Sequence, residues 1–148
     1  MDFTGKVVVI TGASSGIGEA LVYAFADRGA KVVMGARNSA KLAEIAAQLF
    51  TRGIESAFEA TDVTREEDCK RLIDKALSAF GRIDILICNA GISMRALFDD
   101  VQLDVLRQLM DVNFWGTVYC AKYALPALQA AKGTLVGVSS ATQPRNSP

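Results

Sequence analysis

Five short runs of apolar residues recur along the chain, at residues 6–11, 31–36, 55–60, 83–88 and 134–139. Most are rich in β-branched side chains, which is typical of buried strands. Between the runs, apolar residues follow the three- and four-residue spacing of an amphipathic helix. The sets are Ile17, Ala20, Leu21, Ala24 and Phe25; Leu42, Ile45, Ala46 and Leu49; Cys69, Leu72, Ile73, Ala76, Leu77 and Phe80; and Leu103, Leu106, Met110, Phe114, Thr117 and Ala121.

A glycine closes each of the four predicted helices just before the next strand: Gly29, Gly53, Gly81 and Gly133. Glycine suits that position because a helix often ends with a left-handed residue. Five strands that alternate with four helices predict right-handed crossovers and a parallel sheet. The expected fold is therefore α/β, a doubly wound, Rossmann-like domain over residues 1–140. Residues 141–148 contain two prolines and no large apolar side chain, so a disordered tail is expected there.

The composition is consistent with a sheet that is buried on both faces, since 51% of the residues are apolar and the mean hydropathy is +0.25. Basic and acidic residues number 16 each, and no basic run stands out, so neither nucleic acid nor an anionic membrane is an expected partner. The most apolar long window, residues 112–131, is interrupted by Asn113, Lys122, Pro126 and Gln129 and is a poor membrane span. No signal peptide precedes the first strand, and a cytoplasmic location is expected.

Metal and disulfide chemistry are not expected either. The chain has no histidine, and its three cysteines, Cys69, Cys88 and Cys120, are far apart in sequence. We interpret them as reduced thiols of the core. No metal-binding residues are therefore predicted.

The loop after the first strand reads `TGASSGIG` and carries Gly12, Gly16 and Gly18. In an open α/β sheet, ligands bind beyond the carboxyl ends of the strands. Glycines between a buried strand and a helix let the backbone approach a pyrophosphate, whose charge is stabilised by free N–H groups and the helix dipole. A tight turn could also need flexible residues, but three glycines flanked by Ser14 and Ser15 favour phosphate binding.

Further motifs follow in order: `TDV` at residues 61–63, `NAG` at 89–91, Asn113 within the fourth predicted helix, and `VSS` at 138–140. From residue 6 to residue 140 the chain resembles the short-chain dehydrogenase/reductase family. The resemblance implies hydride transfer between a nicotinamide cofactor and a small-molecule carbonyl or alcohol. It implies that the cofactor is held by Gly12, Ser14, Ser15, Gly16, Ile17, Gly18, Arg37, Asp62, Val63, Asn89, Ala90 and Gly91.

Several of these assignments have alternatives. The resemblance implies that Asp62 binds the adenine amino group and that Val63 packs on the ring; a loop aspartate that caps the following helix is the other interpretation. Asn113 is either a buried core amide or, by the resemblance, a residue at a helix distortion that binds a water in a proton relay.

Cofactor choice depends on the end of the second strand. An enzyme that uses NAD usually has an acid there, which binds the ribose 2′-hydroxyl. This chain has Ala36 and Arg37 instead, and a guanidinium can pair with a 2′-phosphate. We therefore expect NADP(H) rather than NAD(H), although a single loop arginine can also be merely solvated.

The resemblance aligns Ser140 with the catalytic serine, which would bind the substrate oxygen. The family's tyrosine and lysine, spaced Tyr-x-x-x-Lys, should follow, but no such spacing occurs in the 148 residues. We expect a family member truncated before this segment, incomplete in fold, catalytically incompetent by itself, and marginally stable because the fourth and fifth strands would lack cover.

The sequence is also consistent with two other functions. The chain could be a non-catalytic nucleotide-binding module, or an interaction protein derived from the family. In the family the fourth helix commonly packs on its copy in another subunit, and Trp115, Val118 and Tyr119 could form such a homo-oligomer contact. Ordinary core packing is the alternative role for these three side chains.

Overall fold

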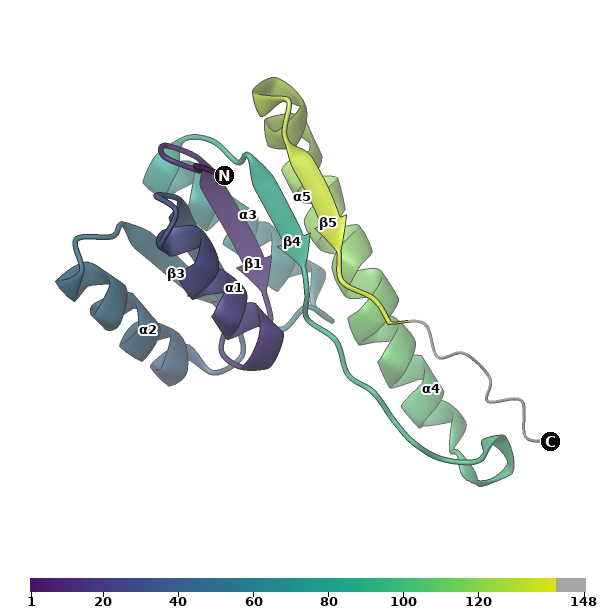
Figure 1. Cartoon of the computed structure of the whole chain (residues 1–148). Helices are drawn as coiled ribbons and strands as arrows, with labels where there is room; N and C mark the ends of the chain where they lie inside the picture. The colour runs from purple at the N-terminus through teal and green to yellow at the C-terminus, as the bar shows by residue number, and fades with distance from the viewer. Residues whose placement is uncertain (141–148) are drawn as a thin grey trace.

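The computed structural model describes residues 1–140, which form one sheet with helices on both faces (Figure 1). The expected tail at residues 141–148 lies outside the described part. All strand pairs are parallel, in the order β3-β2-β1-β4-β5, which confirms the doubly wound prediction. The elements are β1 (Val7–Thr11), α1 (Gly16–Ala26), β2 (Lys31–Ala36), α2 (Ser39–Thr51), β3 (Ser56–Ala60), α3 (Glu66–Phe80), β4 (Ile85–Cys88), α4 (Leu103–Met110), α5 (Gly116–Ala131) and β5 (Thr134–Gly137).

Two separate apolar layers hold the sheet. Helices α1 and α2 cover one face, and α3 and α5 cover the other (Figure 1). Alternate residues of β1 enter opposite layers, so Val8 and Ile10 pack under α1 and α2 while Val7 and Val9 pack under α3 and α5. Every residue of β1 is buried, because the strand lies in the middle of the sheet between β2 and β4.

The buried face of α1 differs from the predicted one. The sequence pattern placed Ile17 and Ala20 in the core, but both are exposed, and the buried residues are Gly18, Val22 and Ala26. A Cβ on Gly18 would lie only 2.0 Å from the carbonyl oxygen of Gly12. Because the helix meets the end of β1 at a residue with no side chain, that contact, and not the apolar pattern, sets the helix's rotation.

The fourth predicted helix is interrupted by a π-helical turn. A 3₁₀ turn (Phe98–Asp100) precedes α4, and the π turn η2 (Asp111–Trp115) joins α4 to α5. A π turn holds one more residue than an α turn, so it shifts the helical phase. The buried side of α5 is consequently Gly116, Cys120, Ala124 and Leu128. Leu103, Met110 and Phe114, which the sequence pattern placed in the core, are between 48% and 62% exposed.

The helix ends follow the glycine prediction at three positions of four. Gly29, Gly53 and Gly81 have positive φ angles, as left-handed closing residues do. After α5 the left-handed residue is Lys132, with φ of 49°. Gly133 serves close packing instead, since a Cβ there would lie 2.3 Å from the carbonyl oxygen of Asp84.

The sequence predicted that apolar side chains of both β4 and β5 would be left exposed, and of these two strands only β5 is exposed. Leu135, Val136 and Val138 are 49%, 37% and 41% exposed. The expectation for β4 is wrong, because Leu86 and Ile87 are buried, one in each apolar layer. Leu86 packs in the layer that α3 and α5 complete, and Ile87 in the layer under α1 and α2.

A buried carboxylate joins the starts of β1 and β4. Asp84 is 5% exposed, and its Oδ2 accepts hydrogen bonds from the Val7 amide and from Nε of Arg82, each at 2.9 Å. Arg82 Nη2 donates to Oδ1 at 2.6 Å, and the ammonium of Lys6 lies 3.6 Å away. Burial alone would raise the pKa of Asp84, but these hydrogen bonds and charges outweigh it and hold the pKa below 3.8.

We expect Asp84→Ala to lower the free energy of unfolding by about 3 kcal/mol at pH 7, because it leaves the Val7 amide and Arg82 without their acceptor. The pKa is lower in the folded state than in the unfolded state, so this stabilisation is complete above the unfolded pKa. It is lost as the pH falls through the folded pKa, in the window below about pH 4. Urea unfolding at several pH values measures both effects. Asp104→Ala, which removes an exposed pair with Arg107, is the control; an equal loss in both variants would contradict this role.

Candidate functional site

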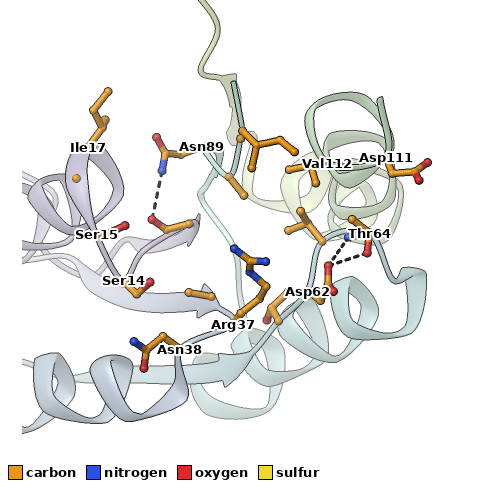
Figure 2. Close-up of a pocket in the computed structure, with 18 of the residues that line it drawn as sticks. Ser14, Ser15, Ile17, Arg37, Asn38, Asp62, Thr64, Asn89, Asp111 and Val112 are labelled. Carbon is orange, nitrogen blue, oxygen red and sulfur yellow. Dashed lines mark hydrogen bonds between the residues drawn. The ribbon is translucent and has the colours of Figure 1, made fainter. Parts of the chain in front are cut away.

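A hollow of about 910 Å³ opens at the carboxyl ends of the central strands (Figure 2). It is lined by the loops that follow β1, β2, β3 and β4 and by one side of the α4–η2 segment. Eleven of the predicted cofactor residues line it: Gly12, Ser14, Ser15, Gly16, Ile17, Arg37, Asp62, Val63, Asn89, Ala90 and Gly91. Eight further residues line the hollow that the sequence did not assign to the cofactor, although Ala36 and Thr61 lie in segments it singled out: Ala36, Asn38, Thr61, Thr64, Ile92, Gln108, Asp111 and Val112.

The glycine loop brings the N-terminus of α1 to the hollow. Gly12 and Gly16 have φ of +65° and +53°, a conformation that side chains disfavour. Ser15 occupies the N-cap position without a side-chain capping bond, so the first N–H groups of α1 are available to an anion. Gly18 lines no part of the hollow; its role is the close contact with Gly12 that fixes the loop against the helix.

Asn89 ties the loop after β4 to the loop after β1. Its Nδ2 donates to the carbonyl oxygen of Thr11 at 3.1 Å. The same Nδ2 donates to the carbonyl oxygen of Gly12 at 3.4 Å (Figure 2). In return, Oγ1 of Thr11 accepts from the amides of Asn89 and Ala90, both at 3.0 Å. Thr11 is 2% exposed, and its position as the last residue of a buried strand was the signal that could have singled it out. These bonds fix two walls of the hollow relative to each other.

Asp62 stands at the end of β3 and faces the hollow from the side of Arg37 (Figure 2). Its Oδ1 accepts from the Thr64 amide at 3.0 Å and the Thr64 hydroxyl at 2.7 Å. Burial alone would raise the pKa of Asp62, but the Thr64 hydrogen bonds and the charges of Arg37 and Arg65 lower it overall. The N-cap of α3 is Arg65, so Asp62 closes a turn before that helix and does not cap it.

Arg37 follows β2 directly, and its guanidinium extends into the hollow (Figure 2). Asn38 comes next and caps α2, with its Oδ1 accepting from the Lys41 amide at 3.0 Å. The residue before Arg37 is the buried Ala36, so no carboxylate stands at the end of β2. The hollow therefore offers a guanidinium cation beside the N-terminus of α2.

Asn113 lies in the π turn, but its amide is exposed and not buried as the sequence pattern suggested. Its Oδ1 accepts from the Ile92 amide at 2.9 Å, and its Nδ2 donates to the Ile92 carbonyl at 2.8 Å. Both polar atoms of the side chain therefore hold the loop after β4. Ser140 lies beyond β5, is exposed, and is not among the residues that line the hollow.

The cysteines behave as core thiols in the part of the chain that the structure describes. All three are buried, and burial raises the pKa of Cys88 to about 11, so its thiol is not a reactive thiolate at neutral pH. No group of three potential metal ligands occurs among residues 1–140. No helix in the same range is long and apolar enough to cross a bilayer.

The sequence and fold of the chain are similar to those of known proteins. Residues 6–147 match the family model described as short chain dehydrogenase. The chain belongs to the short-chain dehydrogenase/reductase family. A relative named 11-beta-hydroxysteroid dehydrogenase A, from Sesamum indicum, is 43% identical over 143 residues. That match covers 95% of this chain and 41% of the relative, so the chain spans about two-fifths of the relative's length.

Two solved structures show the same fold with different cofactors. The alcohol dehydrogenase of Thermococcus sibiricus, complexed with 5-hydroxy-NADP, superposes with a TM-score of 0.87 at 32% identity over 89% of this chain and 57% of that one. A family member from Burkholderia phymatum in complex with NAD has a TM-score of 0.87 at 29% identity, over 93% of this chain and 50% of that one. Nicotinamide dinucleotides of both kinds therefore bind to this fold.

Proposed function

We propose that the chain binds NADP(H) in the hollow at the carboxyl ends of β1 to β4. The observation that carries the proposal is the glycine loop, which presents the N-terminus of α1 to the same hollow that Arg37 enters. The loop suits the pyrophosphate, because backbone N–H groups and the helix dipole stabilise its charge. Asp62 and Val63 would hold the adenine, and Asn89, Ala90 and Gly91 would line the central part of the cofactor.

The preference for NADP(H) rests on Arg37. Its guanidinium can pair with a 2′-phosphate through charge-assisted hydrogen bonds, and no acid stands at the end of β2 to repel that phosphate. Asp62 lies beside Arg37 and bears a negative charge at neutral pH, since its pKa is lowered. The 2′-phosphate would therefore compete with Asp62 for the guanidinium, which predicts a moderate preference for NADP(H).

Arg37→Ala is expected to raise the Kd for NADPH about tenfold and to change the Kd for NADH by less than about twofold. Only the 2′-phosphate distinguishes the two ligands, so the difference isolates the contact in question. Fluorescence titration through Trp115, the single tryptophan, measures both constants. Arg52→Ala, at the far end of α2 and paired with Asp27, is the matched control. An equal loss of both dinucleotides in Arg37→Ala would refute the assignment of NADP(H).

We further propose that the family reaction, hydride transfer between the nicotinamide and a carbonyl or alcohol, is the activity to which this segment contributes. The bound cofactor supplies the hydride or accepts it. Ser140 would donate a hydrogen bond to the substrate oxygen, where negative charge develops during reduction. Asn113 would support a proton relay by fixing the loop at Ile92. The relatives' names make hydroxysteroids the first substrate class to test.

Self-association through α4 and α5 is a further part of the proposal. Trp115 is 44% exposed, and Leu103, Met110, Phe114 and Leu125 are exposed to a similar or greater extent along α4, the π turn η2 and α5. Tyr119 and Val118 are half-buried, and Tyr119 packs against the core. A second copy of the chain would cover the exposed members of this set.

A further inference from the structure

A buried acid at the start of α3 holds the loop that would bind adenine. Asp68 is 8% exposed, although aspartate is rarely buried unless it is paired. Its Oδ2 accepts a hydrogen bond from the main-chain amide of Asp62 at 2.9 Å. The carboxylate therefore binds the backbone of Asp62, whose own side chain faces the hollow.

The other carboxylate oxygen of Asp68, Oδ1, interacts with two arginine side chains. Nη2 of Arg71 donates to Oδ1 at 2.6 Å, and Nε of Arg65 lies 3.8 Å from the same atom. Arg71 also lies 3.7 Å from Oε1 of Glu59 in β3. Because Asp68 is held at both oxygens, it joins α3, the end of β3 and the loop after β3 in one network.

Asp62 is thus fixed on two sides. Thr64 holds its side-chain oxygen, and Asp68 holds its main-chain nitrogen. Its neighbour Val63 packs closely against Gly116 of α5. The space there is too small for a side chain, because a Cβ on Gly116 would lie 2.8 Å from Cβ of Val63. The Gly116 contact restrains the loop at Val63, whereas the Asp68 contact restrains it at Asp62.

We propose that Asp68 is a positioning residue for the adenosine half of the cofactor site, acting through the main chain of Asp62. This inference rests on the proposed function, since it concerns the same hollow. An ionised acceptor makes a stronger hydrogen bond to an amide than a neutral one. When the carboxylate is lost, the loop relaxes and the Asp62 carboxylate is no longer presented at the position that adenine requires.

Asp68→Asn is expected to raise the Kd of adenosine 2′,5′-bisphosphate about tenfold and the Kd of NADPH by the same factor. Adenosine 2′,5′-bisphosphate carries only the adenosine half, so equal factors locate the defect in that half. Asp74→Asn is the matched control: it lies on the same helix, pairs with Lys70 at 2.7 Å and does not line the hollow. Its affinity for both ligands is expected to equal that of the wild type.

A double-mutant cycle separates positioning from loss of stability. In an Asp62→Ala background the adenine contact is already absent, so adding Asp68→Asn is expected to raise the Kd no further. Additive losses, or an unchanged Kd in Asp68→Asn alone, would overturn the inference. Arg71→Met leaves the carboxylate in place but removes its partner, and we expect about a threefold rise in Kd from it. If Asp68→Asn does not fold, Arg71→Met is used in its place. An unchanged Kd in Arg71→Met would then overturn the inference.

Hydrogen exchange distinguishes this inference from the proposed function. The Asp62 amide is expected to exchange at least about tenfold faster in Asp68→Asn than in the wild type without any ligand present. If the wild type binds neither NADPH nor the bisphosphate, the proposed function fails, whatever the exchange rates are. If the wild type binds both and the Asp62 amide exchanges equally in the two proteins, the positioning role fails and the proposed function stands.

Discussion

Replacing Gly18 by alanine is expected to lower the affinity for NADPH by at least about a hundredfold and the free energy of unfolding by about 3 kcal/mol. The new Cβ would lie 2.0 Å from the Gly12 carbonyl oxygen and 2.7 Å from Nδ2 of Asn89. Either the glycine loop or α1 must then move, and both form the anion site. The change also displaces Asn89, which ties the loop after β1 to the loop after β4.

Gly137→Ala is the control for this substitution. Gly137 ends β5, and a Cβ there would meet no atom within 4 Å. We expect unchanged NADPH affinity and a change in unfolding free energy of less than about 0.5 kcal/mol. Thermal unfolding and NADPH titration of the two variants make the comparison. A Gly18→Ala protein that binds NADPH like the wild type would show that the loop does not need this close contact.

A polypeptide of these 148 residues is expected to bind NADPH but to reduce carbonyls about 10²–10⁴-fold more slowly than a chain with the family's tyrosine and lysine. A serine hydroxyl cannot replace them, because a serine that gives up its proton becomes a strongly basic alkoxide. The measurement is the loss of NADPH absorbance with steroid ketones as substrates.

The matched comparison is a chimera in which residues 1–140 are followed by the part of the sesame relative that comes after the residue aligned with Ser140. The chimera is expected to reduce a steroid ketone. Replacing Ser140 by alanine in the chimera is expected to lower kcat about 10²-fold or more. Equal turnover by the 148-residue polypeptide and the chimera would contradict the assigned chemistry.

The sheet could be predicted from the sequence because local and long-range signals agree there. Each of the five apolar runs contains a strand, and the apolar positions predicted to face the core in α2 and α3 do so, with the exception of Leu77, which is 37% exposed. The glycine loop was placed correctly because strand, glycines and helix follow one another without a gap. Eleven of the residues that line the hollow could be predicted for the same reason: parallel strands bring their carboxyl ends to one edge.

The remaining features depend on contacts that no local pattern encodes. The π turn at Asn113 shifts the helical phase between α4 and α5, and three of the six residues in the predicted apolar stripe, Leu103, Met110 and Phe114, are exposed. The rotation of α1 follows from one backbone contact at Gly18. Asp68 looked like an ordinary acid in the first turn of a helix, and only its distance of 2.9 Å to the Asp62 amide shows what it holds.

We expect a nicotinamide dinucleotide to bind at the carboxyl ends of β1 to β4. Amide chemical shifts, measured by two-dimensional NMR while NADPH is added, test it most directly. We expect saturable shifts in the loops at Gly12 to Gly18, Asp62 to Thr64 and Asn89 to Ile92, with the amides at the opposite ends of the same strands unchanged. Saturable shifts confined to other surfaces, or no shifts at all in a folded protein, would contradict binding at this site.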